Sequence, residues 1–289
     1  MQLPTRRTKR IFISAKSRMM AWMVCIILPT LLAVYSWFMD QRPALHVKEE
    51  WSFIDSLIQN SDLILAVVFL LVSAIPFYQV FDKRKAQARD LVPIALMAAM
   101  CIVGRAAFAI VPLPNFKPVS AIVIITGVAF GPEAGYLTGA LAALLSNFLF
   151  GQGPWTPWQM FTWGLLGFLA GVFYRAGFFG HLGDVPVDEN GKRKKPIALC
   201  VFGFFCGILY GWIMNLQHLI GYVRPLNWTA ILTTYVSSIY YDVSHGICTF
   251  LVLWIAGEPW IRKLLRIRKK FGLDGEERNY VMPPSEKER

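Results

Sequence analysis

The sequence predicts an all-α protein that crosses a membrane several times. Of its 289 residues, 55% are hydrophobic and only 16% are charged, which is more apolar surface than a soluble domain of this size can bury. The apolar residues form runs of about helix length, and short basic clusters separate these runs. This distribution is typical of helices oriented by the positive-inside tendency, so the net charge of +11 does not indicate a nucleic-acid-binding protein.

Eight apolar segments account for the expected membrane spans. The first two, 19–38 and 63–81, form an N-terminal extension, and a charged connector, 82–90, separates them from the rest. Because the basic N-terminus is followed by no clear small-residue cleavage site, the first segment is expected to be a retained span. The expected division is an extension with its connector over 1–90, a six-span core over 91–270 and a polar tail over 271–289. The core spans are 91–111, 121–130, 133–150, 159–179, 196–216 and 228–255.

Gly131 and Pro132 interrupt the apolar sequence between 121 and 150, and the number of spans there decides the orientation of every later loop. With two spans, most of the 29 Lys and Arg residues lie on one side of the membrane. With one kinked span, the basic loop 192–195 and the basic tail would face opposite sides. We therefore expect two spans and both termini in the cytoplasm. The first of the two is short, so it must tilt or be shielded by its neighbours.

Glycines recur every four residues in several of the expected core helices. Small residues at this spacing allow helix backbones to approach closely. We therefore expect a compact bundle without a wide aqueous pore. The glycines are Gly127, Gly131, Gly135 and Gly139, then Gly167 and Gly171, and finally Gly203, Gly207 and Gly211.

The segment 151–163, GQGPWTPWQMFTW, lies between two apolar runs and begins a helix. Thr156 is the expected N-cap, Pro157 stands at the first helical position, and Gln159 would close a capping box. Three tryptophans surround this helix start, where an aromatic ring can either anchor the chain at a membrane interface or stack on a flat ligand. They are Trp155, Trp158 and Trp163.

The sequence contains none of the common catalytic signatures. It has no G-x-x-x-x-G-K-[ST] phosphate loop, no H-E-x-x-H motif, no G-x-S-x-G motif and no cluster of carboxylates inside the spans. The five cysteines fall within apolar runs without paired spacing, so we interpret them as reduced core residues. We expect neither an ATPase nor another enzyme, and neither a metal nor a cofactor.

Few polar residues lie at membrane depth, and such residues must face the interior of the bundle. The main ones are Arg105, Asn147, Asp242 and His245. Arg105 could hold an anionic group of a ligand or an internal carboxylate. Asp242 and His245 share a helix face, which suits either a proton relay or a structural pair that satisfies itself or reaches Arg105.

The core from about 85 to 270 resembles the substrate-binding S components of energy-coupling factor (ECF) vitamin transporters. The similarity is carried by the six-span layout and by the segment PNFKPVSAIVIITGVAFGPEAGYLTGALAALLSNFLFGQGPWTPWQM. It implies a high-affinity binding subunit of an ABC importer in a bacterial cell membrane, which works with a transmembrane T subunit and two ABC-type ATPase subunits. Ala95 and Ala99 match the family's small-xxx-small motif, which docks on the T subunit. The two N-terminal spans depart from the family's six-helix pattern.

The resemblance also implies where a vitamin would bind, namely in loops and helix ends near the outer face. Cobalamin or a precursor is the ligand of the most similar subgroup, and a queuosine precursor or another heterocycle stays open. Taken with the polar residues at membrane depth, the expected binding positions are Arg105, Asn115, Lys117, Asn147, Trp155, Thr156, Trp158, Gln159, Asn215, His218 and Tyr222.

Two other functional classes remain to be distinguished. An autonomous proton-coupled carrier would use Asp242 and His245 as coupling groups. A membrane enzyme or assembly factor would need a site that the motifs above do not reveal. Uptake by this chain alone would indicate the carrier, whereas a binding subunit binds its ligand alone and transports only with its partners.

Overall fold

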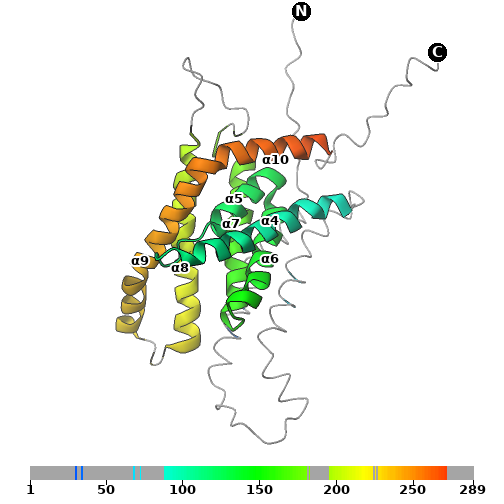
Figure 1. Cartoon of the computed structure of the whole chain (residues 1–289). Coiled ribbons are helices and arrows are strands. Elements are labelled where there is room, and N and C mark those ends of the chain that lie inside the picture. Colours follow the sequence, from blue (N-terminus) through cyan, green and yellow to red (C-terminus); the bar gives the residue numbers. More distant parts are fainter. Residues whose placement is uncertain are drawn as a thin grey trace, which may run out of the picture.

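The computed structural model describes residues 88–180, 195–223 and 227–271, together with a few single positions elsewhere. The two predicted N-terminal spans, most of the connector, the loop 183–194 and the tail beyond 271 lie outside these residues. Every regular element of the described part is helical (Figure 1). The predicted all-α class is confirmed for this part of the chain.

The helices correspond one by one to the six core segments that the sequence predicts, and a further helix follows them. Among the residues that the structure describes, three stretches are long and apolar enough to cross a membrane, namely Leu91–Ile110, Ile197–Ile220 and Trp228–Lys270. The elements in order are α4 (Ala88–Ala107), η1 (Phe108–Ile110), α5 (Val119–Phe130), α6 (Pro132–Phe150), α7 (Trp155–Arg175), α8 (Ile197–Tyr222), α9 (Trp228–Val252), the π-helical turn η2 (Leu253–Gly257) and α10 (Glu258–Lys270).

The chain reverses direction between α5 and α6 at Gly131. This residue has φ of 106°, a conformation that L side chains rarely adopt, and Pro132 then begins α6. Gly127 and Gly135 consequently face each other, since a Cβ at Gly135 would lie 2.7 Å from the Cα of Gly127. The segment 121–150 therefore forms two helices, as predicted, and not one kinked helix.

Helices α5, α6 and α7 pack through their glycines. A Cβ at Gly167 would lie 2.5 Å from the carbonyl oxygen of Gly135, and one at Gly171 would lie 2.5 Å from the backbone nitrogen of Pro132. Helices α8 and α9 use the same device, because Gly207 of α8 lies against the backbone of Gly246. Close packing through small residues is thus confirmed within both groups of helices.

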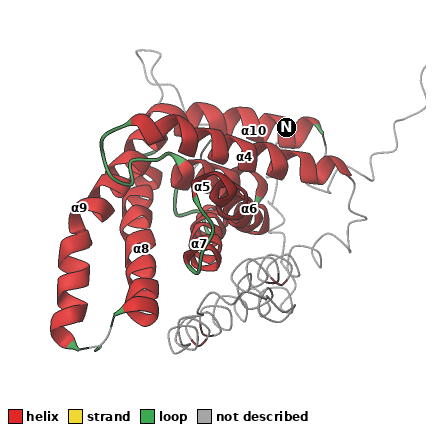
Figure 2. Ribbon diagram, turned by 60° about the horizontal axis from the view of Figure 1, so that its bottom comes forward, coloured by secondary structure: helices red, strands yellow, loops and turns green. Residues whose placement is uncertain are grey.

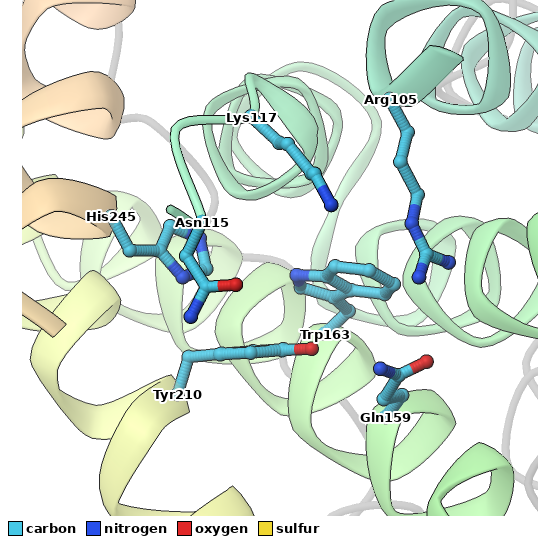
Figure 3. Close-up of a pocket in the computed structure, with 7 residues that line it drawn as sticks. All are labelled: Arg105, Asn115, Lys117, Gln159, Trp163, Tyr210 and His245. Carbon is cyan, nitrogen blue, oxygen red and sulfur yellow. The ribbon is translucent and has the colours of Figure 1, made fainter. Parts of the chain in front are cut away.

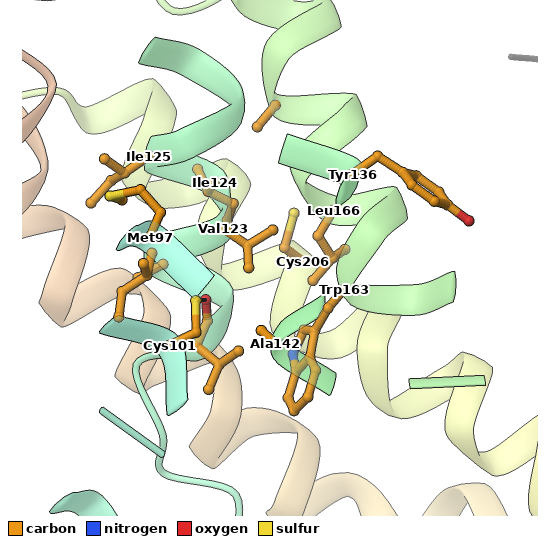
Figure 4. Close-up of a cluster of buried hydrophobic side chains, with 14 of the residues drawn as sticks. Met97, Cys101, Val123, Ile124, Ile125, Tyr136, Ala142, Trp163, Leu166 and Cys206 are labelled. Carbon is orange, nitrogen blue, oxygen red and sulfur yellow. Dashed lines mark hydrogen bonds between the residues drawn. The ribbon is translucent and has the colours of Figure 1, made fainter. Parts of the chain in front are cut away.

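Helix α5 has only 12 residues and is buried along nearly its whole length, because the neighbouring helices surround it. The core around it combines residues of α4, α6, α7 and α8, including Met97, Trp163 and Cys206 (Figure 4). A helix that is apolar on all sides belongs in the interior of a bundle. The predicted shielding of this short helix is therefore confirmed.

Helix α10 lies across the end of the bundle at which α5 terminates (Figure 1). Ile261 on its inner face is completely buried, and the guanidinium of Arg268 donates a hydrogen bond of 2.9 Å to the carbonyl oxygen of Ala129. Its basic side chains Lys263 and Arg266 are exposed. The turn η2 carries the chain from α9 into this crosswise helix (Figure 2).

The predicted capping box at the start of α7 is wrong. The helix begins two residues earlier than expected, after Pro154, and no side chain caps it. Thr156 lies within the first turn, and its hydroxyl donates to the side chain of Gln152 at 2.9 Å. Gln159 instead accepts a hydrogen bond of 2.9 Å from Asn147 of α6. Gln159 thus bonds to a neighbouring helix in place of the expected local partner, whereas the partner of Thr156 lies in the loop just before α7.

Candidate functional site

A small cavity of about 50 Å³ lies where α4, α7, α8, α9 and the loop before α5 come together. Pockets for vitamin-sized ligands usually measure about 300 to 1,000 Å³, so the walls of this cavity must move apart to admit one. The lining side chains converge from elements far apart in the sequence (Figure 3). They are Arg105, Asn115, Lys117, Gln159, Trp163, Tyr210 and His245.

The loop between η1 and α5 brings Asn115 and Lys117 to the cavity. Asn115 adopts φ of 53°, a left-handed conformation that asparagine tolerates, and its carbonyl oxygen accepts from the backbone N–H of Lys117 at 2.9 Å. The ammonium of Lys117 lies 5.6 Å from the ring centroid of Phe150. Burial, and then the neighbouring Arg105, lower the pKa of Lys117. The surroundings of Lys117 therefore disfavour its positive charge.

Arg105, at the end of α4, is only 8% exposed and has its position fixed by α6. Its Nη1 donates to the hydroxyl of Ser146 and, at 2.7 Å, to the side-chain oxygen of Asn147. The guanidinium also lies 4.6 Å from the ring centroid of Phe150 and 5.3 Å from that of Trp163. All of these partners are neutral, so they orient the guanidinium without compensating its charge.

Asn147 connects the Arg105 side chain to the start of α7. Its amide nitrogen donates to the hydroxyl of Thr156 and to the side-chain oxygen of Gln159, each at 2.9 Å. This completely buried amide therefore holds both Arg105 and Gln159 at the cavity wall. A hydrogen-bonded network of this kind favours one arrangement of the site.

The aromatic wall of the cavity is formed by Trp163 and Tyr210. Their rings are stacked with centroids 5.2 Å apart and planes inclined by 26°. The indole N–H of Trp163 donates to the hydroxyl of Ser120 at 3.2 Å, and the same hydroxyl lies 2.8 Å from Nε2 of His245. Ser120, in the first turn of α5, therefore joins α7 to α9.

The structure brings several of the predicted binding residues together. Arg105, Asn115, Lys117 and Gln159 line the cavity. Asn147 and Thr156 lie directly behind them in the hydrogen-bond network.

Other predicted residues lie elsewhere. Trp158 is 1% exposed and belongs to the core, while Trp155 is 36% exposed and its ring covers Gly153. Asn215 donates to Ser238 of α9 at 2.6 Å. His218 and Tyr222, further along α8, are exposed and contact each other with ring centroids 5.8 Å apart.

The structural pair expected of Asp242 and His245 does not form. Asp242 accepts a hydrogen bond of 2.9 Å from Ser238, one turn away on the same helix, and its carboxylate lies beside Gly211. His245 faces Ser120 and the cavity. Within the described residues these side chains bond neither to each other nor to Arg105, because each has a nearer partner.

Trp163, Tyr210 and His245 also line the cavity, although they are not among the binding positions expected from the sequence. The sequence marked Trp163 only as one of three tryptophans that could stack on a ligand or anchor at the interface, and His245 only as part of a proton relay or structural pair. For Trp163 a usable signal exists, since it follows Gln159 by four residues and must share its helix face. Trp158 does not share that face. The sequence has no comparable signal for Tyr210, whose place depends on how α8 packs against α7.

The predicted docking residues Ala95 and Ala99 are both exposed on α4. Exposed apolar side chains surround them on the same helix, among them Leu91, Leu96 and Val103. The opposite face of α4, with Met97 and Cys101, packs into the core. Helix α4 therefore presents an apolar outer face with small residues at its centre.

Comparison with known proteins gives a match over the whole of this site. The family model of the ECF-type riboflavin transporter S component matches residues 85–255. A UPF0397 protein of Vibrio atlanticus (strain LGP32) is 30% identical over 89 residues, which are 30% of this chain and 48% of that protein. The chain thus aligns with about half the length of this curated relative. No solved structure matches.

The family match covers more than half of the chain and includes every residue that lines the cavity. It agrees with the vitamin-transporter resemblance of the sequence but does not single out the cobalamin-type subgroup. The chain belongs to the family of ECF-type riboflavin transporter S components.

Proposed function

We propose that this chain is the membrane-embedded binding subunit of an ECF-type importer and that it captures a planar heterocyclic micronutrient in the cavity between α7 and α8. The stacked pair of Trp163 and Tyr210 is the observation that carries this proposal. Two amides and two cations border the pair. A flat ring with polar edges fits such a wall, because stacking binds its face while amides and cations bind its edge.

The heterocycle that deserves the first test is riboflavin, since the matching family carries its name. Cobalamin and a queuosine precursor are the alternatives from the sequence. The purified chain, without other subunits, should bind one of the three measurably, and mass spectrometry should find the same class of compound co-purifying with it. Absence of a heterocycle in both measurements would contradict the proposal.

The cavity end of the bundle is proposed to face the outside and α10 the cytoplasm. The cavity end carries few basic residues, whereas exposed Lys263, Arg266, Lys269 and Lys270 lie on α10. A cysteine introduced at position 153 should react with an impermeant reagent in intact cells, and one at position 193 should not. The reverse pattern would reject this orientation, and with it the cytoplasmic placement of both termini.

The exposed face of α4 is proposed to dock on the T subunit, which with two ATPase subunits would complete the importer. Ala95 and Ala99 are four residues apart on that face, and their size allows close approach of a partner helix. Leucine at both positions should reduce co-purification of the T subunit while leaving ligand binding by the isolated chain intact. Unchanged co-purification would remove this assignment.

A further inference from the structure

We infer that the ligand of this cavity carries an oxyanion, either a phosphate ester or a carboxylate, and that Arg105 and Lys117 bind it together. The inference builds on the proposed function for the flat part of the ligand, but the anion site itself can be tested without that part. Its basis is the charge and the unused hydrogen-bond donors at one end of the cavity.

The two cations of the cavity have no counterion within the described residues. Neither Arg105 nor Lys117 forms an ion pair there. Three described acidic side chains lie elsewhere: Glu133 pairs with Arg175 at 3.6 Å, Asp242 accepts from Ser238, and Glu258 is buried at the start of α10 and does not line the cavity. Of the two roles that the sequence left open for Arg105, the structure thus favours the ligand over an internal carboxylate. Arg105 is buried and Lys117 partly buried, so holding these two like charges close together without a counterion is costly, and a bound anion would reduce that cost.

The guanidinium of Arg105 also retains an unused donor. Nη1 is bonded to Ser146 and Asn147, but Nε is buried and has no hydrogen-bond partner. An arginine held on one side by fixed neutral acceptors can bind an oxyanion through its remaining N–H groups with little loss of side-chain entropy. The side chain is therefore already oriented for an anion.

Phe150 holds the two cations at the same side of the cavity. Its ring centroid lies 4.6 Å from the guanidinium carbon of Arg105 and 5.6 Å from the ammonium nitrogen of Lys117. Figure 3 shows both charged groups directed toward the space beside the Trp163 ring. Lys117 has three N–H donors and no described hydrogen-bond acceptor. An oxyanion between these two groups would leave Trp163 and Tyr210 for a flat ring.

A matched pair of probes tests the inference. Riboflavin and riboflavin 5′-phosphate share one ring system and differ by one phosphate, so their affinity ratio isolates the anion. The wild-type chain should bind the phosphate at least about tenfold more tightly at low ionic strength, and added salt should reduce the difference. Lys117→Met should abolish the preference, because it keeps an apolar side chain of similar length and removes the charge.

Two further variants make the test specific. Gln159→Glu keeps the acceptor for Asn147 and places a carboxylate in the cavity that Arg105 lines, so it should weaken the phosphate probe selectively. Lys263→Met removes the same charge from the exposed face of α10 and should leave the ratio at its wild-type value. An equal loss in Lys263→Met would show a general charge effect and overturn the inference.

An independent measurement uses anions alone. Inorganic phosphate or malonate should raise the melting temperature of the wild-type chain above that in chloride of equal ionic strength, but not that of Lys117→Met. The more effective anion identifies a phosphate-type or a carboxylate-type site. Stabilisation without binding of any heterocycle would retain the anion site and reject the proposed function. If the chain binds riboflavin and riboflavin 5′-phosphate equally well and neither anion stabilises it, the proposed function is retained and the anion site is rejected.

Discussion

The helices within the group α5–α6–α7, and those within the hairpin α8–α9, pack through glycine backbones, whereas the group and the hairpin pack against each other through side chains. Within each, backbones meet directly through glycines, as at Gly135 with Gly167 and at Gly207 with Gly246. Between them, side chains make the contacts, such as the stack of Trp163 on Tyr210. Figure 2 shows the hairpin alongside the other helices and not interleaved with them.

This difference indicates where the molecule can open. Separating side chains breaks dispersion contacts and a few hydrogen bonds, whereas separating glycine-packed backbones disrupts whole helix faces. The cavity lies at the boundary between the two groups, with Trp163 and Gln159 on one side and Tyr210 and His245 on the other. A cavity of about 50 Å³ can thus be enlarged for a ligand while both groups keep their internal packing.

The largest effect is expected from filling a backbone contact. Gly167→Ala would place a Cβ 2.5 Å from the carbonyl oxygen of Gly135, and neither backbone can yield without shifting a helix. We expect a loss of about 3 kcal/mol in the free energy of unfolding. The measurement is thermal or denaturant unfolding of the purified chain in detergent.

Gly203→Ala on α8 is the matched control. Its Cβ would meet the ends of the Leu253 and Thr249 side chains, and side-chain ends can yield more readily than a helix backbone. Its loss should be less than half of that for Gly167→Ala. Equal losses would mean that backbone contact is not what distinguishes the interior of the α5–α6–α7 group.

A medium effect is expected at the polar contact between the groups. Ser120→Ala would leave the indole N–H of Trp163 and Nε2 of His245 buried without this shared partner. An unsatisfied buried group costs about 1 to 3 kcal/mol, so we expect a loss of roughly 2 kcal/mol in unfolding measurements. Thr126→Val, in the same helix, removes a buried hydroxyl that bonds only to its own turn at Ile122 and should cost clearly less. If both changes cost the same, Ser120 does not join the two groups.

A smaller effect, confined to binding, is expected at the aromatic wall. Trp163→Phe keeps a ring in the stack but reduces its area and removes the N–H, which should weaken ligand binding by roughly tenfold. Trp155→Ala, in the loop that the sequence also marked as a ligand platform, should leave affinity near the wild-type value, because that ring covers Gly153. Binding isotherms of both variants decide between the two tryptophans.

The tryptophans also show how far the sequence predicts the site. Capping signals and proline positions located the start of α7 to within two residues, but they did not predict which aromatic side chains face the cavity. Consecutive residues differ by about 100° around a helix, so Gln159 faces the cavity while Trp158 enters the core. A phase analysis of 155–163 would have selected Trp163.

On α8 the family layout predicted Asn215, His218 and Tyr222, but the cavity lies nearer the middle of that helix. These residues follow Tyr210 by 5, 8 and 12 positions, which corresponds to about 8 to 18 Å along the axis. The depth at which α8 meets α7 is set by tertiary packing, and no local sequence signal reports it. Arg105, Asn147 and the glycine contacts were predictable because burial in lipid allows polar and small residues few other roles.

The smallest effect is expected at Asp242, where the binding subunit and the proton-coupled carrier make opposite predictions. Asp242 accepts one hydrogen bond from Ser238 and contacts Gly211, and an asparagine of equal size can do both. For a binding subunit, Asp242→Asn should change ligand affinity by no more than about twofold and leave uptake dependent on the T and ATPase subunits. A carrier would take up its substrate without those subunits and lose that uptake in the variant. Uptake assays of both forms in cells lacking the T and ATPase subunits therefore separate the two functions. Wild-type uptake that disappears in Asp242→Asn would indicate a carrier in which Asp242 takes part in proton coupling, whereas no uptake by either form is expected of a binding subunit.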